Sequence, residues 1–529
     1  MKLEALAWLF CPTSIAVSCI AVILVYLLIP SPRDRAVQHL PSPEPNYPIL
    51  RNSLELYKVQ KSGKFLDWVF KYCHKYQGKP WCIHAMGKEP CVVLCCPEAF
   101  EDVVKTQFDA FDKSPNVAEA MLDVLGHGIF AVSGPLWLRQ RKIASHLFTA
   151  QMIQYAMEVV VPAKGEELVK RLDEICQKEN EDERVVNIKR LLELYTMDIF
   201  AKVGFGVDLH GVQFNQNAEP LDAFQRMSVR ILKRIQQPMW IWKFLRWLNA
   251  GPEKQFAEDI KIMDEFVYSV ICRSIEEKKK PKGSIANCRK DLISLFIEKW
   301  EMEFTNGVHT TNDLKLMRDF AVSLLAAGRE TTATTISWVI LMLNRYPKVL
   351  EQVRHELKNK LPDLASGKMC TPSLEDIQPL VYLEATIRET LRLFPVVTVT
   401  GRSATRDVWL YDGTFIKAGT RVILPHYSMG RMTTVWGPDA NEFKPERWLD
   451  STMNRTKAAS PFKFSVFLGG PRICLGMKFA LLEMKITLAK LLSHFDLKTV
   501  NDPFELTYGS SITLQIKGPL DVMVSHLTK

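Results

Sequence analysis

Several patterns that would assign this chain to a common class are absent from it. It has no block of lysine and arginine residues interleaved with aromatic residues, although its 68 Lys and Arg exceed its 59 Asp and Glu. A nucleic-acid partner is therefore not expected. The formal net charge of +9 suits an acidic protein partner or an anionic membrane face. Internal repeats and low-complexity tracts are also missing, which excludes solenoid and disordered architectures.

The twelve cysteines have neither the spacing of a disulfide framework nor that of a zinc site. In a chain of 529 residues they fit a reducing compartment best. The alternative would be a zinc cluster built from Cys73, His74, Cys82, His84, Cys91 and Cys95. Scattered small core residues explain these six positions better, because their spacing matches no zinc pattern.

Charge is missing from residues 5–29, a run long enough to cross the hydrocarbon layer of a membrane as a helix. Pro30 and Pro32 end this run. We therefore predict a membrane anchor over 1–29, a proline-rich connector over 30–50 and one domain over 51–529, with a cleaved signal peptide as the alternative to the anchor. Arg33 and Arg35 favour a cytosolic domain, so the sequon that begins at Asn454 should stay unglycosylated.

The most informative segment is FLGGPRICLG at 467–476. Cys474 lies in a glycine-rich turn that leads into a predicted helix from Met477, and both the helix N-terminus and Arg472 favour a thiolate. Gly470 and Gly476 let the backbone approach something large and flat. A thiolate offered to a planar cofactor is the axial ligand of a haem iron. The alternative is a buried structural cysteine, but the complete pattern FxxGxRxCxG, which begins at Phe467, resembles the cytochrome P-450 family.

That resemblance implies non-covalent haem b with Cys474 as the axial ligand of the iron. Trp137 and Arg141, at i and i+4 on one helix, would reach one haem propionate, and Arg402 and Arg472 would meet the other. An exposed pair of a cation and an aromatic ring is the alternative for Trp137 and Arg141. Some animal relatives link haem to a glutamate eleven residues before the first threonine of the motif below, and this chain has Phe320 there.

The segment 319–347 is apolar nearly all round, which predicts a buried helix that crosses the domain. AGRETT interrupts its centre with a glycine, an acid and hydroxyls, and we expect a gap for small molecules there. The resemblance implies that Thr331 holds dioxygen and that Glu330 relays protons to it. A kinked core helix is the alternative.

Charged residues in two further motifs, ETLRLFP and FKPERW, are expected to support the fold. Glu389 and Arg392 share a helix face before Pro395, and Arg447 follows in FKPERW. By resemblance these three form a buried ion-pair network that supports the fold and cofactor retention. A lone ExxR pair on a helix would otherwise be a weak surface pair.

The predicted fold is mainly α with small β-sheets, the cytochrome P-450 fold of a helical part and a smaller β-rich part, and 51–529 would be its haem-thiolate catalytic domain. The 529 residues alone would suggest more than one domain, but the motifs from Trp137 to Gly476 must meet in one site. After residue 501 an alternating pattern on both sides of a KGP turn predicts a closing hairpin.

The motifs AGRETTATTISW, ETLRLFPVV, HYSMGRM and WGPDANEFKPERW are similar to those of plant, fungal and protist fatty-acid omega-hydroxylases. We therefore expect hydroxylation of long-chain fatty acids at or near the omega end, with a sterol or xenobiotic substrate as the alternative. Two further alternatives are a reductase-independent isomerase or dehydratase and a non-catalytic haem carrier or sensor. The expected pocket residues are Ala326, Ala327, Val396, Val397, Thr398 and Ile512.

The resemblance also implies partners and a location. Electrons would come from NADPH through NADPH-cytochrome P-450 reductase, with cytochrome b5 left open as a second donor, at the endoplasmic reticulum membrane. The expected docking face for the reductase consists of Lys142, Lys463, Arg472, Lys478 and Lys485, and the alternative for each of them is an ordinary solvated side chain. The aromatic segment PMWIWKFLRWL at 238–248 would dip into the membrane interface or pack as an ordinary helix.

Overall fold

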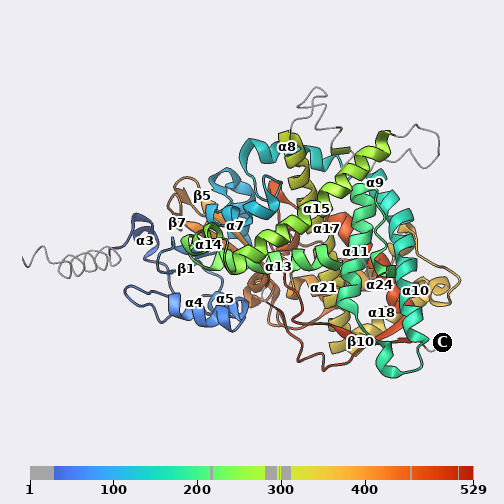
Figure 1. Cartoon of the computed structure of the whole chain (residues 1–529). Helices are drawn as coiled ribbons and strands as arrows, with labels where there is room; N and C mark the ends of the chain where they lie inside the picture. Colours follow the sequence, from blue (N-terminus) through green and yellow to red (C-terminus); the bar gives the residue numbers. More distant parts are fainter. Residues whose placement is uncertain are drawn as a thin grey trace, which may run out of the picture. The chain divides into compact units, whose positions relative to one another are not determined.

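Helices dominate the structure, a computed structural model that describes residues 29–214, 218–279, 295, 296, 298, 311–452, 455–509 and 511–527 (Figure 1). The predicted mainly α fold with small sheets is confirmed. Nearly all of the predicted anchor, and Asn454 of the sequon, lie outside the described residues. Within those residues, no helix is both long enough and apolar enough to cross a membrane.

The chain forms two compact units. The first combines the chain up to Ser114 with Val399–Gly437, and the second combines Pro115–Thr398 with Pro438–Lys529. Small strands lie in both units, whereas the long helices belong to the second. The domain boundaries predicted from the sequence stay predictions.

The first unit contains a five-stranded sheet in the order β1-β2-β8-β5-β3. Strands β2 and β8 are parallel, and the other neighbours are antiparallel. The strands of this unit are β1 (Trp81–Ile83), β2 (Cys91–Val93), β3 (Phe111–Asp112), β5 (Val399–Ala404), β6 (Val408–Trp409), β7 (Phe415–Ile416) and β8 (Arg421–Pro425). Its α-helices are α3 (Pro32–Val37), α4 (Ser53–Lys61), α5 (Phe65–Lys75), α6 (Pro97–Glu101), α22 (His426–Met429) and α23 (Thr433–Trp436).

The second unit is organised around α17 (Thr311–Arg345), which is buried over most of its length. It packs along α11 (Ile188–Phe205) and also contacts α21 (Val381–Leu393) and α24 (Met477–His494). The other helices are α7 (Pro115–Leu125), α8 (Gly134–Ser145), α9 (Ala150–Tyr155), α10 (Val161–Cys176), α12 (Gly211–Phe214), α13 (Ala218–Gln236), α14 (Met239–Trp247), α15 (Pro252–Lys279), α18 (Pro347–Lys360), α19 (Pro362–Ala365) and α20 (Leu374–Ile377). The predicted crossing helix is therefore present and starts earlier than its apolar part.

The glycine in the centre of α17 allows close packing with α11. A Cβ on Gly328 would lie 2.1 Å from an aromatic carbon of Phe200, so only glycine fits at this point. Thr196 on α11 donates its hydroxyl to the carbonyl of Arg329 at 2.9 Å. The ring of Phe200 fills the space on the side of Gly328 that faces α11, so the glycine opens no gap in that direction.

The closing hairpin predicted after residue 501 does not form. Strand β10 (Asp521–His526) pairs instead with β9 (Phe495–Thr499) and β4 (Val185–Asn187), in the order β4-β10-β9. Residues 511–516 make only isolated bridges, at Thr513 with Val397 and at Ile516 with Tyr508. The reason is that the backbone of this segment is held against Val396 and Trp338.

Candidate functional site

Cys474 lies at the end of a tight loop that leads into α24. Leu468 and Gly470 have φ values of 58° and 64°, which turn the chain sharply before a short 3-10 turn at Gly470–Arg472. The amide of Cys474 then donates to the carbonyl of Phe467 at 2.8 Å, and α24 begins at Met477. The predicted arrangement of turn and helix is present, and it brings Phe467, Gly470, Arg472, Cys474 and Gly476 into one loop.

Burial raises the pKa of the Cys474 thiol, although the backbone amides of Gly476 and Met477 and the charge of Arg141 act in the opposite direction. The amides at the start of the helix thus act in the predicted direction, but burial outweighs them in the protein. Protein atoms surround the sulfur on most sides, yet the side chain is accessible to solvent. Coordination to a metal ion deprotonates a thiol outright, and the residues here would stabilise that charge.

Trp137, Arg141 and Arg472 lie together around this loop. The guanidinium of Arg472 stacks over the ring of Trp137, with 4.2 Å from its central carbon to the ring centroid. The same guanidinium donates to the carbonyl of Val132 and to the hydroxyl of Ser133. Burial lowers the pKa of Arg141, and the neighbouring Cys474 acts against that shift. The two residues predicted at i and i+4 on α8 are thus next to the cysteine loop.

Arg402 belongs to the first unit, on β5, where it pairs with Val422 of β8. Burial lowers its pKa to about 10, and Asp112 acts against that shift. Burial and the charge of Arg402 lower the pKa of His426 to about 3, so this histidine is neutral. Arg402 is therefore a buried cation whose hydrogen bond goes to the carbonyl of Gly401, at 3.0 Å.

Three observations fit a large anionic cofactor such as haem. Within the described ranges, neither the half-buried Arg141 nor the buried Arg402 has a carboxylate in salt-bridge contact, and a cation that loses water needs an anion. Cys474 is accessible. Helix α17 is buried from Met317 to Leu343 except at four positions, which are Ala326, Ala327, Gly328 and Thr331. Within the second unit, the sulfur of Cys474, the guanidinium of Arg141 and this accessible run of small residues are groups that haem with a propionate requires.

Glu330 and Thr331 point in different directions from α17. The hydroxyl of Thr331 donates to the carbonyl of Ala327 at 2.5 Å and is partly accessible. The carboxylate of Glu330 is buried and accepts hydrogen bonds from Thr513 and Gln515. The structure therefore does not join the predicted acid and alcohol directly.

Part of the predicted pocket lining comes together in the second unit. Val397 pairs with Thr513, and the amide of Leu514 donates to the carbonyl of Val396 at 2.8 Å. Val397 is exposed and Val396 is buried, while Thr398 and Ile512 are partly accessible. Ala326 and Ala327 lie on α17, which this segment contacts through Glu330 and Trp338.

The predicted ion-pair network is buried and complete. Arg392 donates to both oxygens of Glu389 at 2.8 Å, and both side chains are fully buried. Arg392 also donates to the carbonyls of Ala440 and Glu442. Arg447 approaches Glu389 at 3.4 Å and pairs with Asp439 at 2.8 Å. The structure thus brings Glu389, Arg392 and Arg447 together.

A second buried carboxyl connects α17 with α24. Burial raises the pKa of Glu483 to about 8, although a hydrogen bond with the side chain of Thr332 acts in the opposite direction. Glu483 is therefore mostly protonated at neutral pH, and its partner is the residue next to Thr331. The sequence pattern gave no signal for this contact.

Replacing Glu483 by glutamine should change how stability depends on pH. Between pH 4.5 and 8 the unfolded wild type loses a proton that the folded form keeps, so its free energy of unfolding falls as pH rises through that window. Glu483→Gln has no ionisable group at this position. Its free energy of unfolding should therefore rise relative to that of wild type by on the order of 1–4 kcal/mol between pH 5 and pH 8. Thermal unfolding of both proteins across this range checks the prediction, and parallel curves would contradict it.

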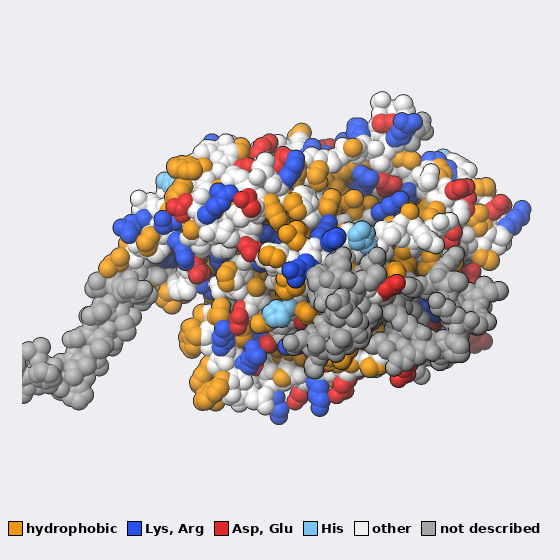
Figure 2. All heavy atoms as spheres, turned by 90° about the horizontal axis from the view of Figure 1, so that it is seen from above, with side chains coloured by type: hydrophobic (Ala, Val, Ile, Leu, Met, Phe, Trp, Pro, Cys, Tyr) orange, Lys and Arg blue, Asp and Glu red, His pale blue; other side chains and the backbone are white. Residues whose placement is uncertain are grey.

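One part of the expected docking face is wrong. Lys485 is buried and donates to Glu384 on α21 at 3.1 Å, because α24 is covered on nearly all sides. Lys142 and Lys478 are exposed, whereas Lys463 and Arg472 are partly buried. On the face shown in Figure 2, basic and acidic side chains are interspersed.

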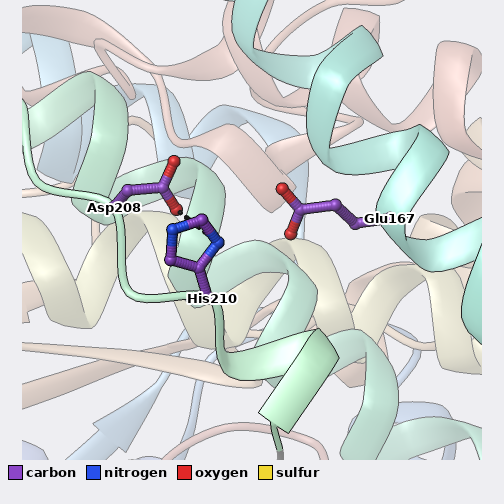
Figure 3. A group of neighbouring side chains, drawn as sticks. All are labelled: Glu167, Asp208 and His210. Carbon is purple, nitrogen blue, oxygen red and sulfur yellow. Dashed lines mark ion pairs between the residues drawn. The ribbon is translucent and has the colours of Figure 1, made fainter.

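A group of potential metal ligands lies apart from these motifs. Glu167 on α10 and Asp208 and His210 after α11 point toward one another (Figure 3). Lys164 already supplies a cation there, at 2.8 Å from Glu167 and 2.5 Å from Asp208. Although burial acts against the charge, hydrogen bonds with Asp208 and Glu167 raise the pKa of Lys164. The group is therefore a partly buried ion-pair cluster around Lys164.

The sequence analysis missed several residues that the structure brings to these groups. Trp448 donates its indole N–H to Glu389 at 2.9 Å. This tryptophan belongs to the PERW motif, but the motif did not indicate that it joins the network. Thr513 and Gln515 alternate with Ile512 and Leu514, a period of two that puts both polar side chains on one side. That period was the available signal, but it does not identify Glu330 as their partner.

Comparisons with known proteins agree with these motifs. A model of the cytochrome P-450 family matches residues 41–522. Cytochrome P-450 CYP94D109 of Paris polyphylla is 32% identical over 445 residues, which cover 82% of this chain and 85% of that protein. Cytochrome P-450 86B1 of Arabidopsis thaliana is 32% identical over 421 residues, 77% of this chain and 72% of that protein. Cytochrome P-450 704B1 of Arabidopsis thaliana is 31% identical over 513 residues, 91% and 94% of the two chains.

Proteins of this family hold haem through a cysteine thiolate, receive electrons from NADPH through a reductase, and act as monooxygenases. With a family match over residues 41–522 and a relative of 31% identity of which it covers 94%, this chain belongs to the cytochrome P-450 family.

Proposed function

We propose that Cys474 is the thiolate ligand of this monooxygenase and that its substrate is a long-chain fatty acid, hydroxylated at or near the omega end. The observation that carries the ligand assignment is the accessible side chain of Cys474, on which the amides at the start of α24 and the guanidinium of Arg141 both act to favour a negative charge. The substrate class rests on the similarity of four motifs to fatty-acid omega-hydroxylases, and the apolar residues Val396, Val397 and Ile512 support it.

When bound, haem supplies the activation of dioxygen and the insertion of one oxygen atom into a C–H bond. The amides of Gly476 and Met477 and the charge of Arg141 stabilise a negatively charged sulfur at Cys474. Trp137, Arg141 and Arg472 would hold haem through its propionates, and Phe467, Gly470 and Gly476 shape the loop that would carry the ligand. On α17, Glu330 would relay protons through its carboxylate. Thr331 would hold a proton on its hydroxyl, which can both donate and accept a hydrogen bond.

A product assay tests the substrate class. The membrane-reconstituted protein is supplied with the reductase, NADPH and palmitate, and the position of the new hydroxyl is determined by mass fragmentation. We expect oxidation at or next to the terminal carbon. Hydroxylation of a sterol or xenobiotic in place of palmitate would reassign the substrate. Turnover of a lipid hydroperoxide without NADPH would indicate an isomerase or dehydratase, and NADPH use at background rate with every lipid would indicate a carrier.

The hydroxyl of Thr331 should determine how much hydroxylated product forms per NADPH consumed. Thr331→Ala removes the only side-chain group of that residue that can hold a proton, so we expect hydroxylation to fall by about 10-fold or more, within the range that positioned acids and bases supply. Hydrogen peroxide should rise in its place while haem content stays at the wild-type level. Unchanged product yield per NADPH would contradict this role.

The predicted location at the endoplasmic reticulum membrane is supported by α14. Trp240 and Trp247 are 71% and 78% exposed, and Phe244 between them is 53% exposed, whereas Trp242 is buried on the other side. An exposed aromatic face of this kind suits a membrane interface. The test uses a chain that begins at residue 30 and measures its binding to phosphatidylcholine vesicles. The double variant Trp240→Ser, Trp247→Ser should bind more weakly than the unsubstituted chain. Equal binding of the two would argue against membrane contact by α14.

A further inference from the structure

Two side chains of the C-terminal segment hold the carboxylate of Glu330. The hydroxyl of Thr513 and the amide Nε2 of Gln515 both donate to Oε1, the latter at 2.5 Å. The second oxygen, Oε2, lies 3.5 Å from the guanidinium of Arg329. All four side chains are buried, so these groups replace water around the carboxylate.

The backbone of the segment explains this placement. Thr513 forms an antiparallel bridge with Val397, and the carbonyl of Leu514 accepts a hydrogen bond from the indole of Trp338 on α17 at 2.6 Å. Side chains alternate along an extended chain, so Thr513 and Gln515 point to the same side. The segment is thus attached to the helix that carries Glu330, and its two donors reach the same oxygen.

Gln515 also connects Glu330 with α13. Nε2 of Gln225 donates to Oε1 of Gln515 at 3.2 Å. The guanidinium of Arg329 lies over the ring of the neighbouring Phe224, with 4.8 Å to its centroid. Two adjacent residues of α13 therefore contact the partners of Glu330, and a movement of α13 would change the surroundings of this carboxylate.

We propose that Thr513 and Gln515 are positioning residues for Glu330, and that Gln225 makes this positioning depend on α13. The inference rests on the proposed proton-relay role of Glu330. Hydrogen bonds from two donors fix one orientation of the carboxylate of Glu330. Both donors come from the segment that contains the expected pocket residue Ile512 and that bridges Val397.

The balance of electrons gives the readout. In productive turnover, two electrons from NADPH and two protons reduce dioxygen, one oxygen atom enters the C–H bond, and the other leaves as water. Without correct proton delivery, the same two electrons and two protons leave with dioxygen as hydrogen peroxide. Loss of the donors to Glu330 should therefore move electrons from product to peroxide without weakening substrate binding.

The test compares Thr513→Val and Gln515→Met with Thr513→Ser in the holoenzyme, with reductase, NADPH and palmitate. The first two variants remove a donor at similar volume, and the third keeps it. We expect product per NADPH to fall at least about 3-fold in the first two, a fraction of the effect of a positioned acid, and to recover in Thr513→Ser. The midpoint of the palmitate-induced spectral change should stay within about 2-fold of wild type, well under the cost of a lost binding contact.

Gln255→Met is the matched control, because the amide of Gln255 also donates to a carboxylate, that of Asp259 at 3.3 Å, but on α15. It should leave product per NADPH unchanged. Equal loss of product in Thr513→Val and Thr513→Ser, or in Gln255→Met and Gln515→Met, would overturn the inference. If Gln515→Met does not fold, the two variants of Thr513 decide.

A double-mutant cycle provides a readout that does not depend on the substrate. Thermal unfolding is measured for Glu330→Gln, Gln515→Met and the double variant. Because the two side chains touch, the shifts in unfolding temperature should not add. Additive shifts in unfolding temperature would overturn the inference. If the wild type neither binds nor hydroxylates palmitate, only the proposed substrate is refuted.

Discussion

Cys474→Ser should abolish hydroxylation. A serine hydroxyl cannot supply the polarisable negative sulfur that thiolate donation requires, and the surroundings of this position are too buried to favour an alkoxide. Even residues that only orient a metal ligand cost about 10- to 100-fold when changed, so loss of the ligand itself should exceed about 100-fold. The measurement is palmitate hydroxylation with reductase and NADPH, expressed per folded protein.

A second cysteine provides the control for this variant. Cys370 is exposed and lies outside the site, so Cys370→Ser should retain the activity and the pigment of wild type. If Cys474→Ser keeps a substantial part of the activity, or if both variants lose it equally, Cys474 is not the ligand. The first outcome would direct attention to another donor in the loop before α24.

Arg392→Leu should prevent the accumulation of folded, haem-containing protein. The change removes both hydrogen bonds to Glu389 and leaves that fully buried carboxylate without its closest cation. The carbonyls of Ala440 and Glu442 lose their donor as well. Breaking a buried pair costs about 3–5 kcal/mol, a large part of a typical stability of about 5–15 kcal/mol. Soluble yield and haem absorbance after expression check the prediction.

Arg171→Leu is the matched control. Arg171 and Glu174 have the same i,i+3 spacing and a contact of 3.0 Å, but their side chains are 45% and 50% exposed. A pair of this kind contributes at most about 1 kcal/mol. We expect normal yield from Arg171→Leu, and a loss of haem equal to that of Arg392→Leu would show that the buried network has no special role.

The elements with strong local patterns could be predicted from the sequence. The apolar run at 319–347 lies within α17, and the helix expected from Met477 is α24. The turn before Cys474 was predictable because the fixed offsets of FxxGxRxCxG are a local feature of the sequence. Gly470 lies in this pattern, and its φ of 64° is one that glycine adopts readily. The ion-pair network followed from the family pattern, since spacing alone does not distinguish a buried ExxR pair from an exposed one.

Features that depend on distant contacts could not be predicted in the same way. Glu330 binds residues more than 180 positions away, and no local pattern states which side chain a buried carboxylate faces. The sequence around Lys485 is that of a surface cation, whereas in the structure α24 is buried there and Lys485 pairs with Glu384. The protonation of Cys474 depends on burial, which outweighs the helix amides and Arg141.

The absorption spectrum of the reduced protein under carbon monoxide tests the assignment of Cys474 most directly. We expect wild type to show the Soret band of a thiolate-ligated haem, and Cys474→Ser to lose it. A band of the histidine-ligated type in wild type, or purified folded protein without pigment, would contradict the thiolate site on which the proposed chemistry depends.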